Sequence, residues 1–235
     1  MKQHLGSTSR FFRLSLLATF LLMLLMVGVG YCQDEPTAPI EQPQAQQAEA
    51  TPAVDPNLPQ GLEKEASDDL YYAMEQLMQG KIAEARQAVA WLEEREDLQP
   101  ETVAYLHSVL GTAAAYEGKY QEAVQEFQTM LTWAVSEQAK VAAYSAIGCN
   151  LRAQGRLAEA IAQYEALITN HPKVPEYCAE ANYQIGDILY LQGRYQEALS
   201  RFSCVQTKYA TTSWKQVIGR KVAEVSACVA KPGAK

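Results

Sequence analysis

The chain has 235 residues, with 20 Lys and Arg against 27 Asp and Glu, which gives a formal net charge of −7. This length allows one or two domains, and a hydrophobic content of 48% is compatible with a packed core. The acidic balance argues against nucleic acid as a partner, because phosphate backbones are bound by clustered positive charge.

The N-terminal segment, residues 1–31, has the pattern of an export signal. Basic residues without any acid come first, and an apolar run follows from Leu14 to Val29. A basic start before an apolar core is typical of a segment that directs a chain across a membrane. We therefore predict that residues 1–31 are a signal peptide or a membrane anchor, and that the remainder is exported to the periplasm.

Three fates of this segment stay open. The small residues Gly28 and Gly30 favour simple cleavage before Tyr31. The four residues ending at Cys32 also resemble a bacterial lipobox, although Tyr31 departs from that motif, and lipidation of Cys32 would leave four of the five cysteines. About 18 apolar residues can also just span a bilayer as a retained anchor. Lipidation or retention would tether the protein to the membrane on its periplasmic side.

A Pro-rich segment follows. Residues 34–60 contain six of the ten prolines, and Gln, Ala and acidic residues make up most of the rest. Such a composition cannot bury a core. We therefore predict that residues 32–65 form a disordered acidic linker, in which residues 34–60 would span about 30 Å as a coil and roughly 80 Å when fully extended.

The remainder of the chain contains an internal repeat. Four glycines recur at an almost constant interval, and an alanine follows each by five positions. The glycines are Gly80, Gly118, Gly155 and Gly193, and the alanines are Ala85, Ala123, Ala160 and Ala198. Apolar residues recur at helical spacing on both sides of each glycine, which predicts two helices joined by a turn. We predict a helical domain over residues 66–230, with repeats to about residue 210 and a capping helix from Ser213 to Cys228.

Each repeated residue type has a packing role. The turn glycine can adopt a positive φ and end the first helix, and the alanine allows the two helices to cross closely. A larger residue, four positions after the alanine, fills the gap between the helices. These larger residues are Val89, Phe127, Tyr164 and Phe202. A second small residue precedes each turn glycine by seven positions, at Ala73, Gly111, Gly148 and Gly186.

This order of residues resembles the tetratricopeptide repeat. The resemblance implies an all-α, right-handed α-solenoid of about four helix pairs whose concave groove binds a protein or peptide. The period of this repeat is longer than the usual tetratricopeptide period. In this it is similar to two groups of bacterial envelope proteins, the Tol-Pal-associated coordinator of cell-wall synthesis and the outer-membrane-protein assembly lipoprotein. The clamp that grips a C-terminal carboxylate in chaperone-binding members is not matched, because Ser108 and Thr112 occupy two of its positions.

The resemblance also implies which side chains face the groove, on the first helix of each pair. They are Tyr105, Ser108, Thr112, Tyr116, Cys149, Arg152, Tyr183, Asp187 and Tyr190. Tyrosines supply large, rigid contact area with a polar end, and they are frequent at binding surfaces. The alternative that some of these tyrosines pack against the neighbouring repeat stays open.

Two cysteines are placed opposite each other in the last helix pair. Cys178 precedes the turn at Gly193, and Cys204 follows it at a similar separation along the chain. In an antiparallel pair this spacing brings them within about one helical turn of each other. Two alternatives stay open for this pair: a disulfide, or two small, buried apolar residues. Cys149 and Cys228 have no evident mate.

No pattern in the chain indicates catalysis. The sequence has no phosphate-binding loop, no GxSxG and no HExxH, and its Cys and His spacings do not match zinc sites. We therefore expect no enzyme activity, cofactor, metal or small-molecule substrate. Two functions are left open: an adaptor that binds a protein or peptide in its groove, or a structural subunit of an envelope assembly.

Overall fold

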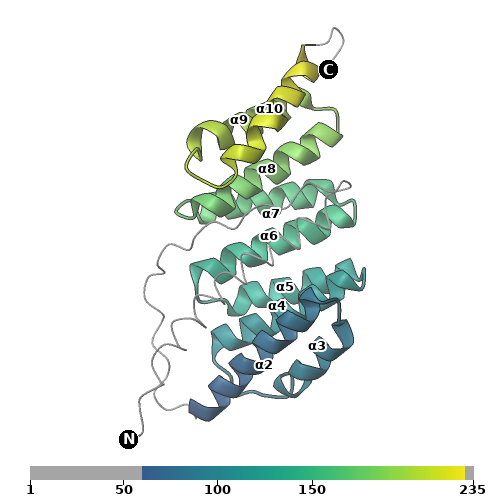
Figure 1. The fold of residues 1–235 in the computed structure, drawn as a ribbon, viewed down its shortest axis with the longest axis vertical. Helices are drawn as coiled ribbons and strands as arrows, with labels where there is room; N and C mark the ends of the chain where they lie inside the picture. Colours follow the sequence, from purple (N-terminus) through teal and green to yellow (C-terminus); the bar gives the residue numbers. More distant parts are fainter. Residues whose placement is uncertain (1–59, 231–235) are drawn as a thin grey trace, which may run out of the picture. The chain divides into compact units, whose positions relative to one another are not determined.

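The structure, a computed structural model, describes residues 60–230, and every element in this range is helical (Figure 1). The all-α fold predicted from the sequence is confirmed. The helices are α2 (Gln60–Met78), α3 (Ile82–Val89), the short 3₁₀ helix η1 (Ala90–Leu92), α4 (Pro100–Tyr116), α5 (Tyr120–Trp133), α6 (Glu137–Ala153), α7 (Leu157–Asn170), α8 (Pro175–Leu191), α9 (Tyr195–Lys208) and α10 (Lys215–Val229). They form four successive helix pairs and a final single helix. The predictions for residues 1–31, for Cys32 and for most of the linker lie outside the described residues.

The chain divides into two compact units, with the boundary between Lys140 and Val141 inside α6. In the first unit, α2, α3 and α4 share one apolar core. In the second unit, α8 packs on α7 and α9, and α10 packs on α9. Within the described range, no helix combines the length and the hydropathy that crossing a bilayer requires.

The turn inside each helix pair is built as the repeat predicts. Gly80, Gly118, Gly155 and Gly193 have φ angles of 74°, 73°, 74° and 74°. This left-handed conformation costs glycine little, whereas a side chain would strain it. The turn is closed by backbone hydrogen bonds such as that from Lys119 N to Ala114 O, at 2.9 Å. The sequence-based prediction that these glycines end the first helix is confirmed.

The crossing of the two helices pairs a glycine with an aromatic ring. A methyl group at Gly111, Gly148 or Gly186 would lie 3.0, 2.7 and 2.7 Å from the rings of Phe127, Tyr164 and Phe202, respectively. All three rings are buried. The first helix pair has the larger Ala73 with the smaller Val89 at the equivalent positions, both buried in one cluster. The volume at each crossing is thus shared between a small and a large residue.

Helix α2 begins six residues before the predicted domain boundary. The carboxylate of Glu63 accepts hydrogen bonds from the backbone N of Gln99 (3.0 Å) and from Oγ1 of Thr102 (2.6 Å). These bonds hold the first turn of α2 against the start of α4. Residues 60–65 are therefore helical, and the prediction that they belong to the linker is wrong.

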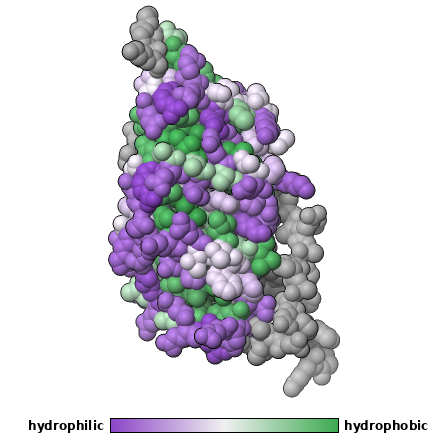
Figure 2. All heavy atoms as spheres, turned by 180° about the vertical axis from the view of Figure 1, so that it is seen from behind, coloured by the Kyte–Doolittle hydropathy of each residue, from purple (hydrophilic) through white to green (hydrophobic). Residues whose placement is uncertain are grey.

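A second glutamate near the start of a helix accepts hydrogen bonds from a distant segment, here the one before the last helix. Glu176 at the start of α8 accepts hydrogen bonds from the backbone N (3.1 Å) and Oγ (3.0 Å) of Ser213. The Ser213 hydroxyl is therefore bound to another helix, and α10 begins at Lys215 with Trp214 at its N-cap. The capping helix exists as predicted, and it begins two residues after Ser213. Polar side chains cover much of the surface seen in Figure 2, with apolar ones between them.

Candidate functional site

The predicted groove residues of the second unit meet each other between α6 and α8. Arg152 donates from Nη1 to Oε1 of Gln184 (2.8 Å) and from Nη2 to Oδ2 of Asp187 (2.6 Å). The side chains of Arg152 and Asp187 are only 12% and 15% exposed. A charge-assisted pair with so little water around it fixes both side chains. The structure brings these two predicted residues together.

Helix α10 covers part of the face of α8 that was predicted to be exposed. The ring of Tyr183 lies 4.9 Å from that of Trp214 and 5.6 Å from that of Phe202, centroid to centroid. Tyr183 is therefore buried, and burial raises its pKa to about 12, with the nearby Asp187 adding to the effect. The prediction that Tyr183 faces an open groove is wrong, because the last helix packs on it.

The contacts from α6 to α8 and from α8 to α10 use the same positions. Midway along α6, Ser145 Oγ donates to Glu180 Oε1 of α8 (2.9 Å), and midway along α8, Tyr183 contacts Trp214. Farther along, Arg152 meets Asp187, and Nζ of Lys221 lies 5.2 Å from the ring centroid of Tyr190. Glu180 and Trp214 are thus equivalent positions, as are Asp187 and Lys221. This register also makes Arg220 of α10 the equivalent of Gly186 of α8.

In the first unit, most predicted groove residues are also used within the fold. Ser108 and Thr112 are buried on α4, where their hydroxyls donate to the backbone oxygens of Tyr105 (2.8 Å) and Ser108 (2.7 Å). Tyr105 and Tyr116 are half-buried and pack on the core that α4 shares with α2 and α3. Burial raises the pKa of Tyr105 to about 12. Ser108 and Thr112 are therefore not available to a ligand, which corrects their assignment.

The accessible part of the predicted site lies at the end of α8. Leu191 is 65% exposed, and Tyr190 before it is half-buried. A hydrogen bond to Glu224 raises the pKa of Tyr190 to about 12, because the neutral hydroxyl is the donor. Nζ of Lys221 lies 3.5 Å from Oδ1 of Asp187. Sequence reasoning missed Leu191 and Lys221; the available signal for Leu191 was a leucine two residues before the turn glycine.

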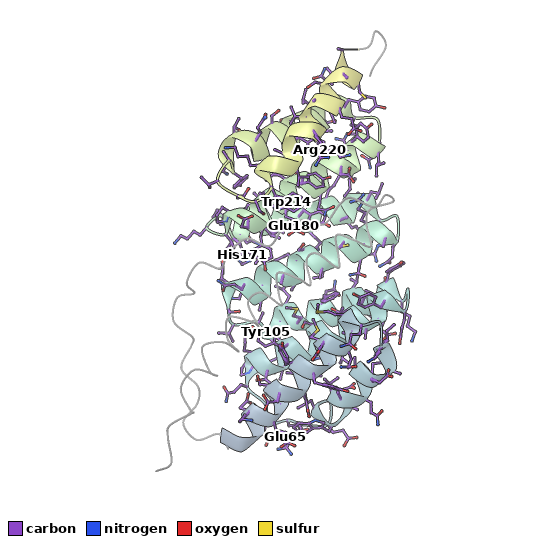
Figure 3. All side chains as sticks on the ribbon, in the orientation of Figure 1. Glu65, Tyr105, His171, Glu180, Trp214 and Arg220 are labelled. Carbon is purple, nitrogen blue, oxygen red and sulfur yellow. The ribbon has the colours of Figure 1, made fainter. Side chains whose placement is uncertain are left out.

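Figure 3 labels three of the residues that define this register. Glu180 lies on α8, Trp214 directly precedes α10, and Arg220 lies on α10. Among the remaining predicted groove residues, Cys149 is half-buried on α6. The second unit therefore offers a face made from α6, α8 and α10, in which Arg152, Asp187 and Lys221 are already paired.

The two cysteines of the possible disulfide are free thiols in the structure. The thiol of Cys178 is buried and lies 3.4 Å from the backbone oxygen of His171. Burial raises its pKa, and the hydrogen bond with Tyr209 partly offsets that effect. Cys204 is half-buried on α9. The disulfide is thus not formed here, because the Cys178 thiol is directed to partners other than Cys204.

Among residues 60–230, no group of three or more His, Cys, Asp or Glu side chains is arranged to hold a metal ion.

A comparison with known protein families supports the repeat. The model of the tetratricopeptide repeat matches residues 145–202, which run from within α6 to within α9. This match supports a tetratricopeptide repeat protein, whose repeats generally mediate contacts between proteins. No curated protein and no solved structure gives a significant match to the chain.

Proposed function

We propose that this protein is a non-catalytic scaffold that binds a protein or peptide in the bacterial cell envelope. The observation that carries the proposal is the array of helix pairs, matched by the tetratricopeptide repeat over residues 145–202. The export-signal pattern of residues 1–31 supports the periplasm as its location, free or tethered to the membrane. The likeness in repeat length to the bacterial envelope proteins supports the same location.

The partner would bind at the end of the face formed by α6, α8 and α10. Leu191 and Tyr190 supply apolar area there, and large side chains in such places dominate many interfaces. The pair between Arg152 and Asp187 is formed before any ligand arrives, so its side chains lose little further freedom on binding. A short peptide with an apolar anchor fits this chemistry.

A second function is favoured by the burial of the predicted groove residues. Ser108, Thr112 and Tyr183 are all used inside the fold, which leaves fewer side chains for a groove ligand. A structural subunit of an envelope assembly would instead use the ends of the array or its other faces. Sedimentation of the detergent-extracted protein distinguishes these two functions: an adaptor sediments without a fixed set of other proteins, whereas a subunit remains in a large particle that contains them.

Affinity capture from membranes tests the site directly. The tagged chain with Tyr190→Ala and Leu191→Ala should lose most of its partner, because an anchor residue contributes about 2 kcal/mol or more. The matched control carries Trp133→Ala and Val135→Ala, which remove an exposed apolar pair from the other unit. Equal capture by both variants and the parent would reject this face as the site. Absence of any specific partner for the parent would reject the binding function itself.

A further inference from the structure

Helix α2 exposes an aromatic residue at a position that the other helix pairs bury. Leu110, Ile147 and Ile185 each precede the small residue of the crossing, and they are 5%, 1% and 0% exposed. Leu110 belongs to the apolar core that α4 shares with α2 and α3. Tyr72 holds the same position on α2, directly before Ala73, and it is 48% exposed. No described helix precedes α2, so its packing position is left open.

Carboxylates surround Tyr72 on the exposed face of α2. Glu65 and Glu75 are exposed, and neither has an ion-pair partner within the described residues. Glu65 is labelled on α2 in Figure 3. Asp68, one turn before Tyr72, is also exposed and pairs with Lys64 at 2.6 Å. This face, which we call the α2 face, therefore combines one aromatic ring with two uncompensated negative charges.

Helix α10 presents a complementary surface. Among the helical glycines whose surroundings are described, Gly219 alone has open space where a side chain would be, while Gly111, Gly148 and Gly186 each face an aromatic ring. Glycine inside a helix costs about 1 kcal/mol relative to alanine, and nothing in the described chain requires it at position 219. The spacing along α10 places Ala223 one turn after Gly219 on the same side. Together they form a flat strip, which we call the α10 face.

Two basic residues flank this strip. Lys215 and Arg220 are exposed, and neither has an ion-pair partner in the described part of the chain. Arg220 is labelled on α10 in Figure 3, and it replaces the small residue that the register puts at Gly186 in α8. The two halves of the helical region also differ in net charge. Residues 60–140 contain 6 basic and 15 acidic residues, a net charge of −9, whereas residues 141–235 contain 11 and 7, a net charge of +4.

We propose that the α2 face of one copy docks on the α10 face of a second copy. The ring of Tyr72 would lie on Gly219, as three rings already lie on glycines within the molecule, and Glu65 and Glu75 would meet Lys215 and Arg220. The charge of the Pro-rich segment does not complement the α2 face, because residues 34–59 contain five acidic residues and no basic one. The two faces differ, so the contact is heterologous and can extend into a row of copies.

Photo-crosslinking in the full chain tests this contact. A photoreactive phenylalanine analogue replaces Tyr72, and two differently tagged copies are expressed together. We expect a crosslinked product that contains both tags, with the linked peptide derived from α10. The matched control places the same analogue at Trp133, which is 45% exposed in the same unit, and it should give no such product.

Gly219→Leu should reduce the product at least tenfold, because it fills the space for the ring. Leucine is a good helix former and position 219 is exposed, so the helical circular dichroism should be unchanged. Lys215→Glu with Arg220→Glu should reduce the product about tenfold by placing like charges together. Glu65→Lys with Glu75→Lys in the other copy should then restore it.

Four outcomes would overturn the proposal. They are the absence of any product that carries both tags, a linked peptide outside α10, a link only to a different protein, and a yield that neither set of α10 substitutions changes. Loss of partner capture through Tyr190 and Leu191 would not affect this result, because those residues belong to a different face.

Discussion

The glycine at the helix crossing of the last pair can be tested by adding one methyl group. In Gly186→Ala the new Cβ would lie 2.7 Å from Cε1 and 3.0 Å from Cδ1 of Phe202, whereas ordinary contacts are 3.4–4 Å. The ring cannot easily withdraw, because Phe202 is fully buried and its centroid lies 5.6 Å from that of Tyr183. Overpacking of this kind costs about 1–3 kcal/mol.

The substitution also has a favourable term, since alanine is about 1 kcal/mol better than glycine inside a helix. Gly219→Ala supplies that term alone, because no atom lies within 4 Å of the added methyl group. The difference in unfolding free energy between the two variants is therefore the overpacking cost, about 1–3 kcal/mol. Urea denaturation followed by circular dichroism measures it, in dilute protein at high salt so that copies stay separate.

A double variant checks the mechanism. Gly186→Ala with Phe202→Val reproduces the combination that Ala73 and Val89 form in the first helix pair. Its destabilisation should be smaller than the sum of the two single effects, with a coupling of about 0.5–3 kcal/mol. If Gly186→Ala proves as stable as Gly219→Ala, the ring does not limit the space at this crossing and the reasoning fails.

Further predictions concern charge, pH and the extent of the domain. Arg152→Gln should cost about 1–3 kcal/mol in urea unfolding by weakening the bond to the little-exposed Asp187, whereas Arg201→Gln, which breaks a more exposed pair, should cost less than about 1 kcal/mol. The raised pKa of Tyr183, about 12 against 10.0 unperturbed, adds stability that is present below pH 10 and lost as the pH rises to about 12. Tyr183→Phe should reduce the change in phenolate absorbance near pH 12 by the share of one tyrosine, because Tyr105 and Tyr190 also titrate there, and an unchanged amplitude would contradict the burial. Residues 60–235 should fold without the preceding segment into an almost wholly helical protein, and substantial strand signal in circular dichroism would contradict the fold.

The predicted processing of the N-terminal segment and the possible disulfide can be tested chemically. Mass spectrometry of the mature protein distinguishes cleavage before Tyr31, lipidation of Cys32 and retention of residues 1–31. Peptide mapping without reductant, after export, shows whether Cys178 and Cys204 pair. Free thiols at both positions would agree with the structure, in which Cys178 faces the His171 carbonyl.

The sequence by itself determined the helix pairs and their turns. A turn glycine with a positive φ and an alanine at a close crossing are local requirements, so they recur with the period of the repeat and can be recognised in the printed chain. The match of the repeat family to residues 145–202 follows from the same regularity.

Which surfaces remain open was decided only by the tertiary structure. Tyr183 and Tyr190 both lie on the first helix of the last pair, yet α10 buries the first and leaves the second half-exposed. The start of α2 is likewise held by hydrogen bonds that Glu63 accepts from the segment that begins α4, far along the chain. Burial is set by neighbouring helices and not by a residue's own position in the repeat, which is why the helices were predictable and the binding face was not.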